Sequence, residues 1–318
     1  MDRPGSVATL RKAVADFART HLPGEARWCV ALSGGADSLA LAAVAAAERP
    51  TTALIVDHRL QVDSAGVAAT ARRQALDLGC VDAQVLCVDV GSDGGPEAAA
   101  RSARYGALDT ARDGAPVLLA HTLDDQAETV LLGLGRGSGA RSMAGMRAHD
   151  PPWCRPLLGI RRVLTHAACT ELGLEPWHDP HNDDARFTRV RLRREVLPLL
   201  EDVLGGGVAE ALARTAASLR EDTETLDGQA AATLEALRGE LDAATLAPMP
   251  AALRRRVIRG WLLAGGASGL TDKHIRAVDA LVTAWRGQGG VAVPSPLCKQ
   301  RLFAGRSAGR LVLTREPL

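Results

Sequence analysis

The chain has 318 residues, 47% of them hydrophobic, which is enough for two domains that each bury an apolar core. Its formal net charge is +1, so no overall field of one sign marks it as a nucleic-acid-binding protein. The longest apolar run, Leu39 to Ala47, is too short to cross a bilayer, and the first residues lack the apolar segment of a signal peptide. We therefore expect a cytoplasmic protein without a membrane partner.

The six cysteines are scattered along the chain, and no two of them form a C-x-x-C pair. Cys29, Cys80 and Cys87 lie in or near apolar runs, where a buried and inert thiol is the usual outcome. This spacing favours a reducing compartment and offers neither a disulfide framework nor a zinc or iron–sulfur motif.

In the first part of the chain, apolar runs typical of strands alternate with helical patterns. We expect strands over residues 28–32, 52–57, 84–90 and 116–121, and helices over residues 6–20, 37–48, 63–79, 96–112 and 123–134. Nearly continuous apolar strands separated by helices are typical of a parallel sheet that helices cover on both faces. The pattern predicts an α/β domain over residues 1–200.

The segment Ser33-Gly34-Gly35-Ala36-Asp37-Ser38 follows the first predicted strand and leads into a helix. Two glycines allow backbone conformations that other residues avoid, and a helix N-terminus offers unpaired N–H groups to an anion. The segment therefore predicts a phosphate site, although a plain glycine turn would also explain it. It is not a Walker loop, because no lysine follows the glycines, and it lacks the third glycine of a dinucleotide fingerprint.

Polar residues also follow two further strands of the predicted sheet. Asp57 and His58 come after the second strand, and His121 ends the fourth. Because ligands of parallel sheets bind at the carboxyl ends of the strands, these residues indicate one site shared with the glycine-containing segment.

The helix after His121 is acidic at its start. Thr122 could cap it, its first turn carries Asp124 and Asp125, and helical spacing brings Glu128 near both acids. Facing a triphosphate, such carboxylates can hold magnesium or take a proton from an amine. A well-capped helix with acids at its favourable end would also explain the pattern.

The sequence changes character around Gly205-Gly206-Gly207. Helical patterns follow over residues 208–238, 250–264 and 271–285, and strand patterns over residues 291–293 and 311–313. We predict a smaller, mainly helical domain over residues 206–318 that ends in a β element.

The hexamer of residues 33–38 resembles the pyrophosphate loop of the N-type ATP pyrophosphatases, the PP-loop superfamily. Together with the spacing His121-x-x-Asp124-Asp125-x-x-Glu128-Thr129, it resembles the tRNA(Ile)-lysidine synthetase family. Further matching segments are residues 100–105, 136–139, 145–146, 155–158, 179–183, 187–189 and 191–193. The chain departs from the family at Thr122, where a second histidine is usual, and at Val190, where an asparagine is usual.

The resemblance implies an adenine nucleotide α-hydrolase-like fold and an enzyme that uses ATP and Mg²⁺. The residues implied to bind ATP are Ser33, Gly34, Gly35, Ala36, Asp37 and Ser38 around the pyrophosphate, with Val56 and Asp57 near the adenine. Asp37 would also bind the metal. The implied reaction adenylates the oxygen at carbon 2 of the wobble cytidine in the CAU anticodon of tRNA(Ile), and free L-lysine then displaces AMP to give lysidine.

The resemblance also suggests roles for the acids and the arginines. Asp124 or Asp125 would take the proton of the lysine amine, and Glu128 would bind the lysine ammonium or the magnesium. Arginines that would contact tRNA are Arg101, Arg104, Arg136, Arg155, Arg189, Arg191 and Arg193. Residues 186–194 include five arginines, and a solvated basic helix would also explain that run. The domain of residues 206–318 would bind tRNA, and a homodimer is compatible with the sequence.

Three other functions would share the segment of residues 33–38, which we call the phosphate loop. A PP-loop tRNA sulfur-transferase generally needs a reactive cysteine pair or cluster, which the cysteine spacing does not provide. A small-molecule amidotransferase-type ligase would not need the arginine-rich segment. A nucleotide-binding RNA adaptor would bind nucleotide and RNA but would not catalyse a reaction.

Overall fold

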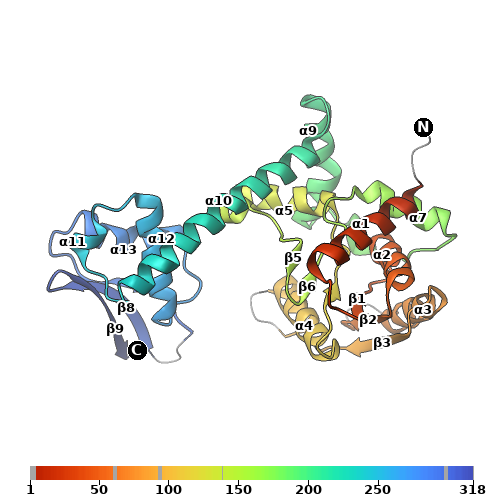
Figure 1. The fold of residues 1–318 in the computed structure, drawn as a ribbon, viewed down its shortest axis with the longest axis horizontal. Coiled ribbons are helices and arrows are strands. Elements are labelled where there is room, and N and C mark those ends of the chain that lie inside the picture. The colour runs from red at the N-terminus through yellow and green to blue at the C-terminus, as the bar shows by residue number, and fades with distance from the viewer. Residues whose placement is uncertain (1–4, 60–62, 92–94, 138, 297–299, 318) are drawn as a thin grey trace. The chain divides into compact units, whose positions relative to one another are not determined.

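The computed structural model describes residues 5–59, 63–91, 95–137, 139–296 and 300–317. The chain divides into two compact units, which we call the first unit (Met1–Leu131 with Met146–Ala213) and the second unit (Leu132–Gly145 with Arg214–Leu318). Figure 1 shows the course of the chain through both. No helix among the described residues is both long and apolar enough to span a membrane.

The first unit is built on a six-stranded sheet with the strand order β3-β2-β1-β4-β6-β5. Its strands are β1 (Trp28–Ala31), β2 (Thr51–Asp57), β3 (Asp82–Cys87), β4 (Val117–Leu118), β5 (His149–Asp150) and β6 (Trp153–Cys154). All neighbours pair in parallel except β5 and β6, which pair antiparallel at the edge. The predicted α/β fold with a mainly parallel sheet is confirmed.

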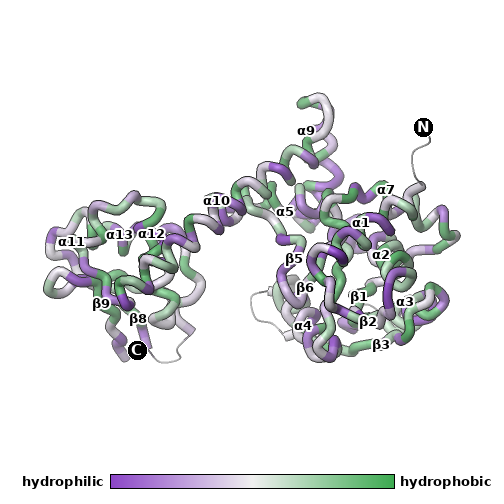
Figure 2. Tube along the Cα trace, in the orientation of Figure 1, coloured by the Kyte–Doolittle hydropathy of each residue, from purple (hydrophilic) through white to green (hydrophobic). Residues whose placement is uncertain are grey.

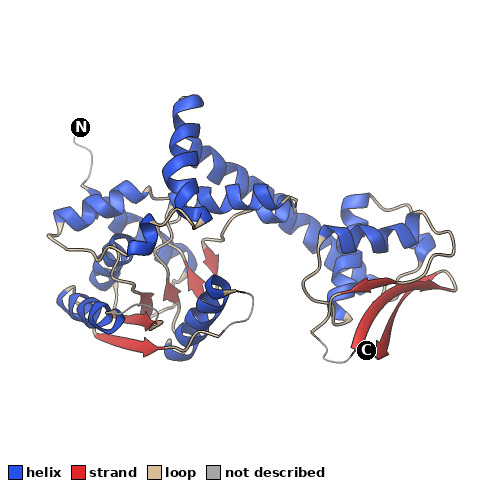
Figure 3. Cartoon of the chain, turned by 180° about the vertical axis from the view of Figure 1, so that it is seen from behind, coloured by secondary structure: helices blue, strands red, loops and turns tan. Residues whose placement is uncertain are grey.

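Helices pack on both faces of this sheet (Figures 1 and 3). The helices of the first unit are α1 (Ser6–His21), α2 (Ala36–Glu48), α3 (Ser64–Asp77), α4 (Pro96–Ala111), α5 (Leu123–Arg136, whose end belongs to the second unit), α7 (Arg162–Glu171), α8 (Thr188–Arg191) and α9 (Leu197–Val203). A 3-10 turn (Pro180–Asp183) and a π-helical turn (Leu192–Val196) complete them.

Alternate strand residues enter two separate apolar cores. Val30 packs in a core with residues of α1, α2 and α7, whereas its neighbour Cys29 packs in a second core with Leu108 of α4. This alternation follows from the two-residue period of a strand. It explains why the strands read as continuous apolar runs, and Figure 2 shows the same hydrophobic character along α2.

In the first unit, three predicted strands end earlier than expected, one of them by a single residue (at Ala31), and two short strands were not predicted. The strand expected over residues 84–90 ends at Cys87, and the strand expected over residues 116–121 is only Val117–Leu118. Beyond Leu118, Leu119 N still donates to Cys154 O (2.7 Å), but the chain then turns into α5. Strands β5 and β6 have two residues each, too few to leave a periodic signal in the sequence.

The second unit contains helices and a three-stranded antiparallel sheet of order β7-β8-β9. Its elements are α6 (Ala140–Met143), most of α10 (Val208–Ala236), α11 (Ala243–Leu246), α12 (Ala251–Ala264), α13 (Asp272–Thr283), β7 (Val291–Val293), β8 (Gln300–Ser307) and β9 (Arg310–Pro317). The fully buried side chains of Leu246, Ile258 and Leu262 lie in its core. The smaller, mainly helical part with a terminal β element is therefore present, with a larger sheet than the sequence predicted.

Candidate active site

The loop of residues 33–38 joins β1 to α2 at the carboxyl end of the strand. Gly34 has φ +85°, which strongly favours glycine, and its carbonyl accepts a hydrogen bond from Trp177 N (2.9 Å). The Ser33 and Ser38 hydroxyls lie 3.1 Å apart, and Ser38 Oγ donates to Gly35 O (2.9 Å). Gly35 is the N-cap of α2 and no side chain caps it, so the start of the helix can receive an anion.

Three carboxylates stand on the first two turns of α5. Thr122 donates from both its backbone N and its Oγ1 to Asp125 Oδ2, each at 2.8 Å, and so fixes the start of the helix. One turn later, Glu128 is 0% exposed. A buried carboxylate is stable only with counter-ions and hydrogen bonds, so the surroundings of Glu128 must be basic.

Arg162, the first residue of α7, lies among these acids. Its guanidinium donates to Asp125 Oδ1 (2.5 Å), Glu128 Oε1 (3.3 Å) and Asp37 Oδ2 (3.2 Å), and its backbone N donates to Asp124 Oδ2 (2.7 Å). One residue therefore contacts all four acids that were predicted to be catalytic, Asp37, Asp124, Asp125 and Glu128. We call these four carboxylates and Arg162 the acid cluster.

Further arginines surround the acid cluster. Arg193 Nε donates to Glu128 Oε1 (2.8 Å), Arg189 Nη1 lies 3.6 Å from Glu128 Oε2, and Arg161 Nε donates to Asp124 Oδ1 (3.3 Å). Arg189 and Arg193 were predicted as tRNA contacts, and the structure places both beside the acids.

The sequence analysis missed Arg161, Arg162 and Thr165. Thr165 Oγ1 donates to Asp37 Oδ1, so α7 supplies two of the hydrogen bonds to that carboxylate. One signal could have indicated them: four acids predicted at one site require counter-ions, and the Arg161-Arg162 pair opens the helical pattern that follows the matching segment 155–158.

The electrostatic environment differs between the acids. Burial raises the pKa of Asp37, although Arg162 and Thr165 oppose the rise. Burial also acts to raise the pKa of Asp125, but Arg162 and the hydrogen bonds from Thr122 outweigh it, so that pKa is lowered. Burial lowers the pKa of His121 to about 4, which leaves the imidazole neutral near pH 7.

A cavity of about 330 Å³ opens beside the acid cluster within the first unit. Its lining residues are Asp124, Glu128, Arg161, Arg193, Leu197, Pro198, Glu201 and Ala209. It thus combines carboxylates, guanidinium groups and an apolar wall. Such a lining suits a ligand that carries both charges and an aliphatic chain.

Buried nitrogen atoms without a hydrogen-bond partner lie near the ends of three strands. Among the described residues, these include His58 Nδ1, His121 Nδ1 and Arg155 Nε. Arg104 of α4 lies near both histidines, whose pKa values its charge helps to lower. Unpaired buried polar atoms are costly unless a ligand or water pairs with them, so these atoms mark a place for a polar ligand.

The other predicted site residues lie at varied positions. Asp57 is buried at the end of β2 and accepts from Arg59 N (2.8 Å), and Val56 packs beside it in the core against α4. Arg155 is also buried and donates to Arg147 O (2.9 Å). Arg191 pairs with Glu195 at the surface (2.8 Å). Arg136 ends α5 in the second unit, and Ser138 of the matching segment 136–139 lies outside the described residues.

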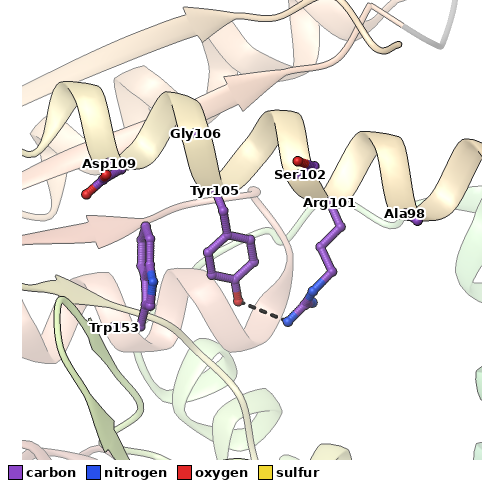
Figure 4. A pocket seen from close by; sticks show the side chains of 7 residues that line it. All are labelled: Ala98, Arg101, Ser102, Tyr105, Gly106, Asp109 and Trp153. Carbon is purple, nitrogen blue, oxygen red and sulfur yellow. Dashed lines mark hydrogen bonds between the residues drawn. The ribbon is translucent and has the colours of Figure 1, made fainter. Parts of the chain in front are cut away.

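Arg101 lines a shallow hollow of about 560 Å³ on α4 and β6 (Figure 4). Its Nη2 donates to the Tyr105 hydroxyl (3.3 Å), and its guanidinium lies 4.8 Å from the centre of the Tyr105 ring. The Tyr105 ring in turn meets Trp153 edge to face at 4.7 Å. Tyr105 therefore packs against neighbouring side chains, and Arg101 remains exposed.

Asp37 is the residue that could hold a metal ion. Mg²⁺ commonly uses one or two carboxylates together with phosphate oxygens of the substrate. Among the described residues, no group of three or more histidines, cysteines or acids is arranged to hold a metal by itself. The Asp37 carboxylate beside the uncapped start of α2 fits a Mg²⁺ site whose other ligands are phosphate oxygens of the substrate.

Comparisons with known proteins agree with this geometry. The PP-loop domain family matches residues 7–200, and the TilS substrate binding domain matches residues 241–312. The tRNA(Ile)-lysidine synthase of Mycobacterium tuberculosis is 71% identical over 324 residues, covering 100% of both chains. The enzymes of the same name from Mycobacterium leprae (68% identical, 100% of both chains) and Nocardia farcinica (63%, 96% of this chain and 98% of that one) are similar.

Among solved structures, the U34-tRNA thiolase NcsA from Methanococcus maripaludis shares the fold over part of this chain. It superposes with a TM-score of 0.55 at 18% identity, covering 68% of this chain and 80% of that one. At this identity the likeness concerns the fold alone. The family matches and the full-length relatives, by contrast, show that the chain belongs to the tRNA(Ile)-lysidine synthase family.

Proposed function

We propose how this chain performs the reaction of its family. Membership of the family makes the chain an enzyme that uses ATP and forms lysidine on tRNA(Ile). The observation that carries the proposed mechanism is the acid cluster, which joins Asp37 of the phosphate loop to three carboxylates of α5 through Arg162. We infer that Asp37 serves the nucleotide and the α5 acids serve the amine.

The first step is adenylation of the wobble cytidine. ATP binds with its pyrophosphate against the start of α2, where Ser33 and Ser38 donate from their hydroxyls, and with its adenine near Val56 and Asp57. The oxygen at carbon 2 of the cytidine attacks the α-phosphorus, and the bond to pyrophosphate breaks. Mg²⁺ held by Asp37 and the phosphates would supply the charge that stabilises the leaving pyrophosphate.

The second step is attack by free lysine. The cavity of about 330 Å³ can hold it, with Leu197 and Pro198 along the aliphatic chain and Arg161 near the carboxylate. The ε-amine must lose a proton before it attacks carbon 2 and expels AMP. We assign that proton to Asp124, because Asp124 lines the cavity and Asp125 is not among the lining residues.

The tRNA contacts are assigned by position and charge. Arg104 lies near His58 and His121, whose buried Nδ1 atoms have no hydrogen-bond partner, so we assign it to a phosphate or to the flipped cytidine. The exposed Arg101 and Arg191 fit the RNA backbone. Arg189 and Arg193 contact Glu128, so we assign them to the acid cluster and not to the RNA backbone. Arg136 and Arg155 remain proposed tRNA contacts. We infer that residues 206–318 form a domain that binds tRNA, which the match to a substrate binding domain supports.

A tRNA sulfur-transferase is the alternative that the fold alone would allow. It is not favoured, because the curated relatives that match over the full length are lysidine synthases. In addition, burial raises the pKa of the Cys80 and Cys154 thiols to about 11, which makes both thiols poor nucleophiles.

The experiment supplies tRNA with a CAU anticodon, ATP and labelled lysine, followed by nucleoside analysis. The proposal predicts label in lysidine, release of AMP and pyrophosphate, and no label when uridine replaces the wobble cytidine. Equal labelling of both RNAs would overturn the assigned target. A requirement for a sulfur donor would instead indicate thiolation.

A further inference from the structure

Of the arginines described above that contact the carboxylates of the acid cluster, Arg162 is the least exposed. Its side chain is 15% exposed, against 32% for Arg193, 38% for Arg161 and 40% for Arg189. The three carboxylates that its guanidinium reaches come from two helices, Asp37 from α2 and Asp125 and Glu128 from α5. Among the arginines that the structure describes, Arg162 is the one whose side chain bonds directly to acids of both α2 and α5.

Each nitrogen of the guanidinium has its own acceptor. Nε donates to Asp37, Nη2 to Asp125 and Nη1 to Glu128, so the planar group fixes the three carboxylates in one arrangement. The backbone N–H of the same residue fixes Asp124. A lysine ammonium has three donors but a compact, freely rotating head, so it could supply the charge without holding the same three positions.

The position of Arg162 is itself fixed by packing. Residues of α7 such as Ala168 and Cys169 lie in the same core as α2, and Cys169 Sγ donates to Ala36 O (3.3 Å). Arg162 therefore starts a helix that packs against α2, the helix that follows the phosphate loop. Its position is thus set by the core of the first unit.

We propose that Arg162 is a positioning residue that couples the nucleotide half of the site to the amine half. It holds Asp37 within the phosphate loop, and it holds Asp124 and Glu128 at the cavity proposed for lysine, so that both reaction steps use one rigid set of carboxylates. This inference rests on the proposed function. It assigns no contact between Arg162 and a substrate.

The test compares Arg162→Met and Arg162→Lys with the wild-type enzyme. For Arg162→Met we expect kcat for lysidine formation to fall about 100-fold, because a misplacement of about 1 Å at a reacting group has an effect of that size. We also expect KM for both ATP and lysine to rise, because carboxylates of both halves lose their alignment. Arg162→Lys should restore the melting temperature but not kcat or either KM.

Arg49→Met is the matched control. Arg49 donates to Leu22 O (2.8 Å) and Glu25 O (2.7 Å) and lies over the Trp28 ring, so its loss removes an arginine with fixed contacts outside the acid cluster. It should lower the melting temperature and leave both KM values unchanged. Calorimetric binding of ATP without tRNA gives a second readout, and only the Arg162 variants should bind ATP more weakly.

Two results would overturn the inference. One is an Arg162→Lys enzyme with wild-type kcat and KM values, and the other is an Arg162→Met enzyme whose kcat falls only in proportion to the folded fraction while both KM values stay unchanged. Failure of the proposed function looks different, because the wild-type enzyme itself would then not transfer labelled lysine to the CAU tRNA.

Discussion

Each unit of the molecule buries a cluster of arginines and acids, and the two clusters differ in composition. In the second unit, Arg254 Nε (2.6 Å) and Arg255 Nε (2.9 Å) both donate to Asp279, and Arg254 Nη1 also donates to Met249 O (2.7 Å). Two cations thus share one acid, and side-chain exposures of 9% for Arg254 and 6% for Asp279 leave little access.

The acid cluster of the first unit brings more acids together and opens on a cavity. Arg162 bonds to Asp37, Asp125 and Glu128, and Arg189 and Arg193 also lie beside Glu128. The cavity of about 330 Å³ beside them is lined by three acids (Asp124, Glu128 and Glu201) and two arginines (Arg161 and Arg193). An arrangement built only to hold helices together needs no excess of acids, as the Asp279 cluster shows. Acids in excess of arginines in the lining of a cavity can instead receive a cationic ligand, which fits an amine substrate.

The largest expected effect separates the two clusters by activity. Asp37→Ala should lower tRNA-dependent pyrophosphate release about 10³-fold, because it removes the carboxylate that we propose holds Mg²⁺ beside the phosphates. Asp279→Asn should leave the rate per folded molecule unchanged. Both rates are measured by pyrophosphate release at a temperature where the variants are folded, and equal losses would remove the functional distinction.

Stability should separate the clusters in the other direction. Asp279→Asn should reduce the free energy of unfolding by about 3 kcal/mol, because it leaves the buried Arg254 without its counter-ion. Denaturant unfolding checks this, with Arg310→Gln as the control, since the Arg310–Glu240 pair is exposed (60% and 70%). A loss at Asp279 no larger than at Arg310 would contradict the structural role.

Glu128→Gln should act on the amine half alone. We expect KM for lysine to rise about 10-fold to 100-fold, because a buried charged hydrogen-bond acceptor is lost, while the dissociation constant for ATP stays unchanged. Steady-state kinetics with lysine varied and calorimetry with ATP distinguish the two. A weaker ATP affinity with unchanged lysine KM would reverse the assignment of the two halves.

The smallest effect is a pH dependence of stability at Asp279. Burial acts to raise the pKa of Asp279, but hydrogen bonds from Arg254 and Arg255 outweigh it and hold that pKa below its usual 3.8. The carboxylate therefore stabilises the fold above pH 3.8 and loses this contribution as pH falls through the lowered pKa. Unfolding of wild type and Asp279→Asn should converge in that acidic range, and a constant difference would refute the explanation.

The sequence predicted the parts of the site that depend on local spacing. The phosphate loop follows from Gly34 and Gly35 between a strand and a helix, and the proximity of Glu128 to Asp124 follows from the helical period. The parallel sheet follows from alternating apolar runs. These features need only neighbouring residues to be recognised.

The parts that were missed depend on contacts between distant segments. Arg162 and Asp37 are 125 positions apart and meet because α7 packs on α2, and no periodicity reports that packing. Thr165 was missed for the same reason, since it is 128 positions from Asp37. Strands β5 and β6 were missed because two residues carry no pattern.

The division of labour between Asp37 and the α5 acids is tested most directly with Asp124→Asn, ATP and CAU tRNA. We predict that this variant releases pyrophosphate, keeps AMP attached to the tRNA, and releases AMP far more slowly than wild type when lysine is added. Failure to release pyrophosphate, or release of AMP at the wild-type rate on addition of lysine, would contradict the assignment.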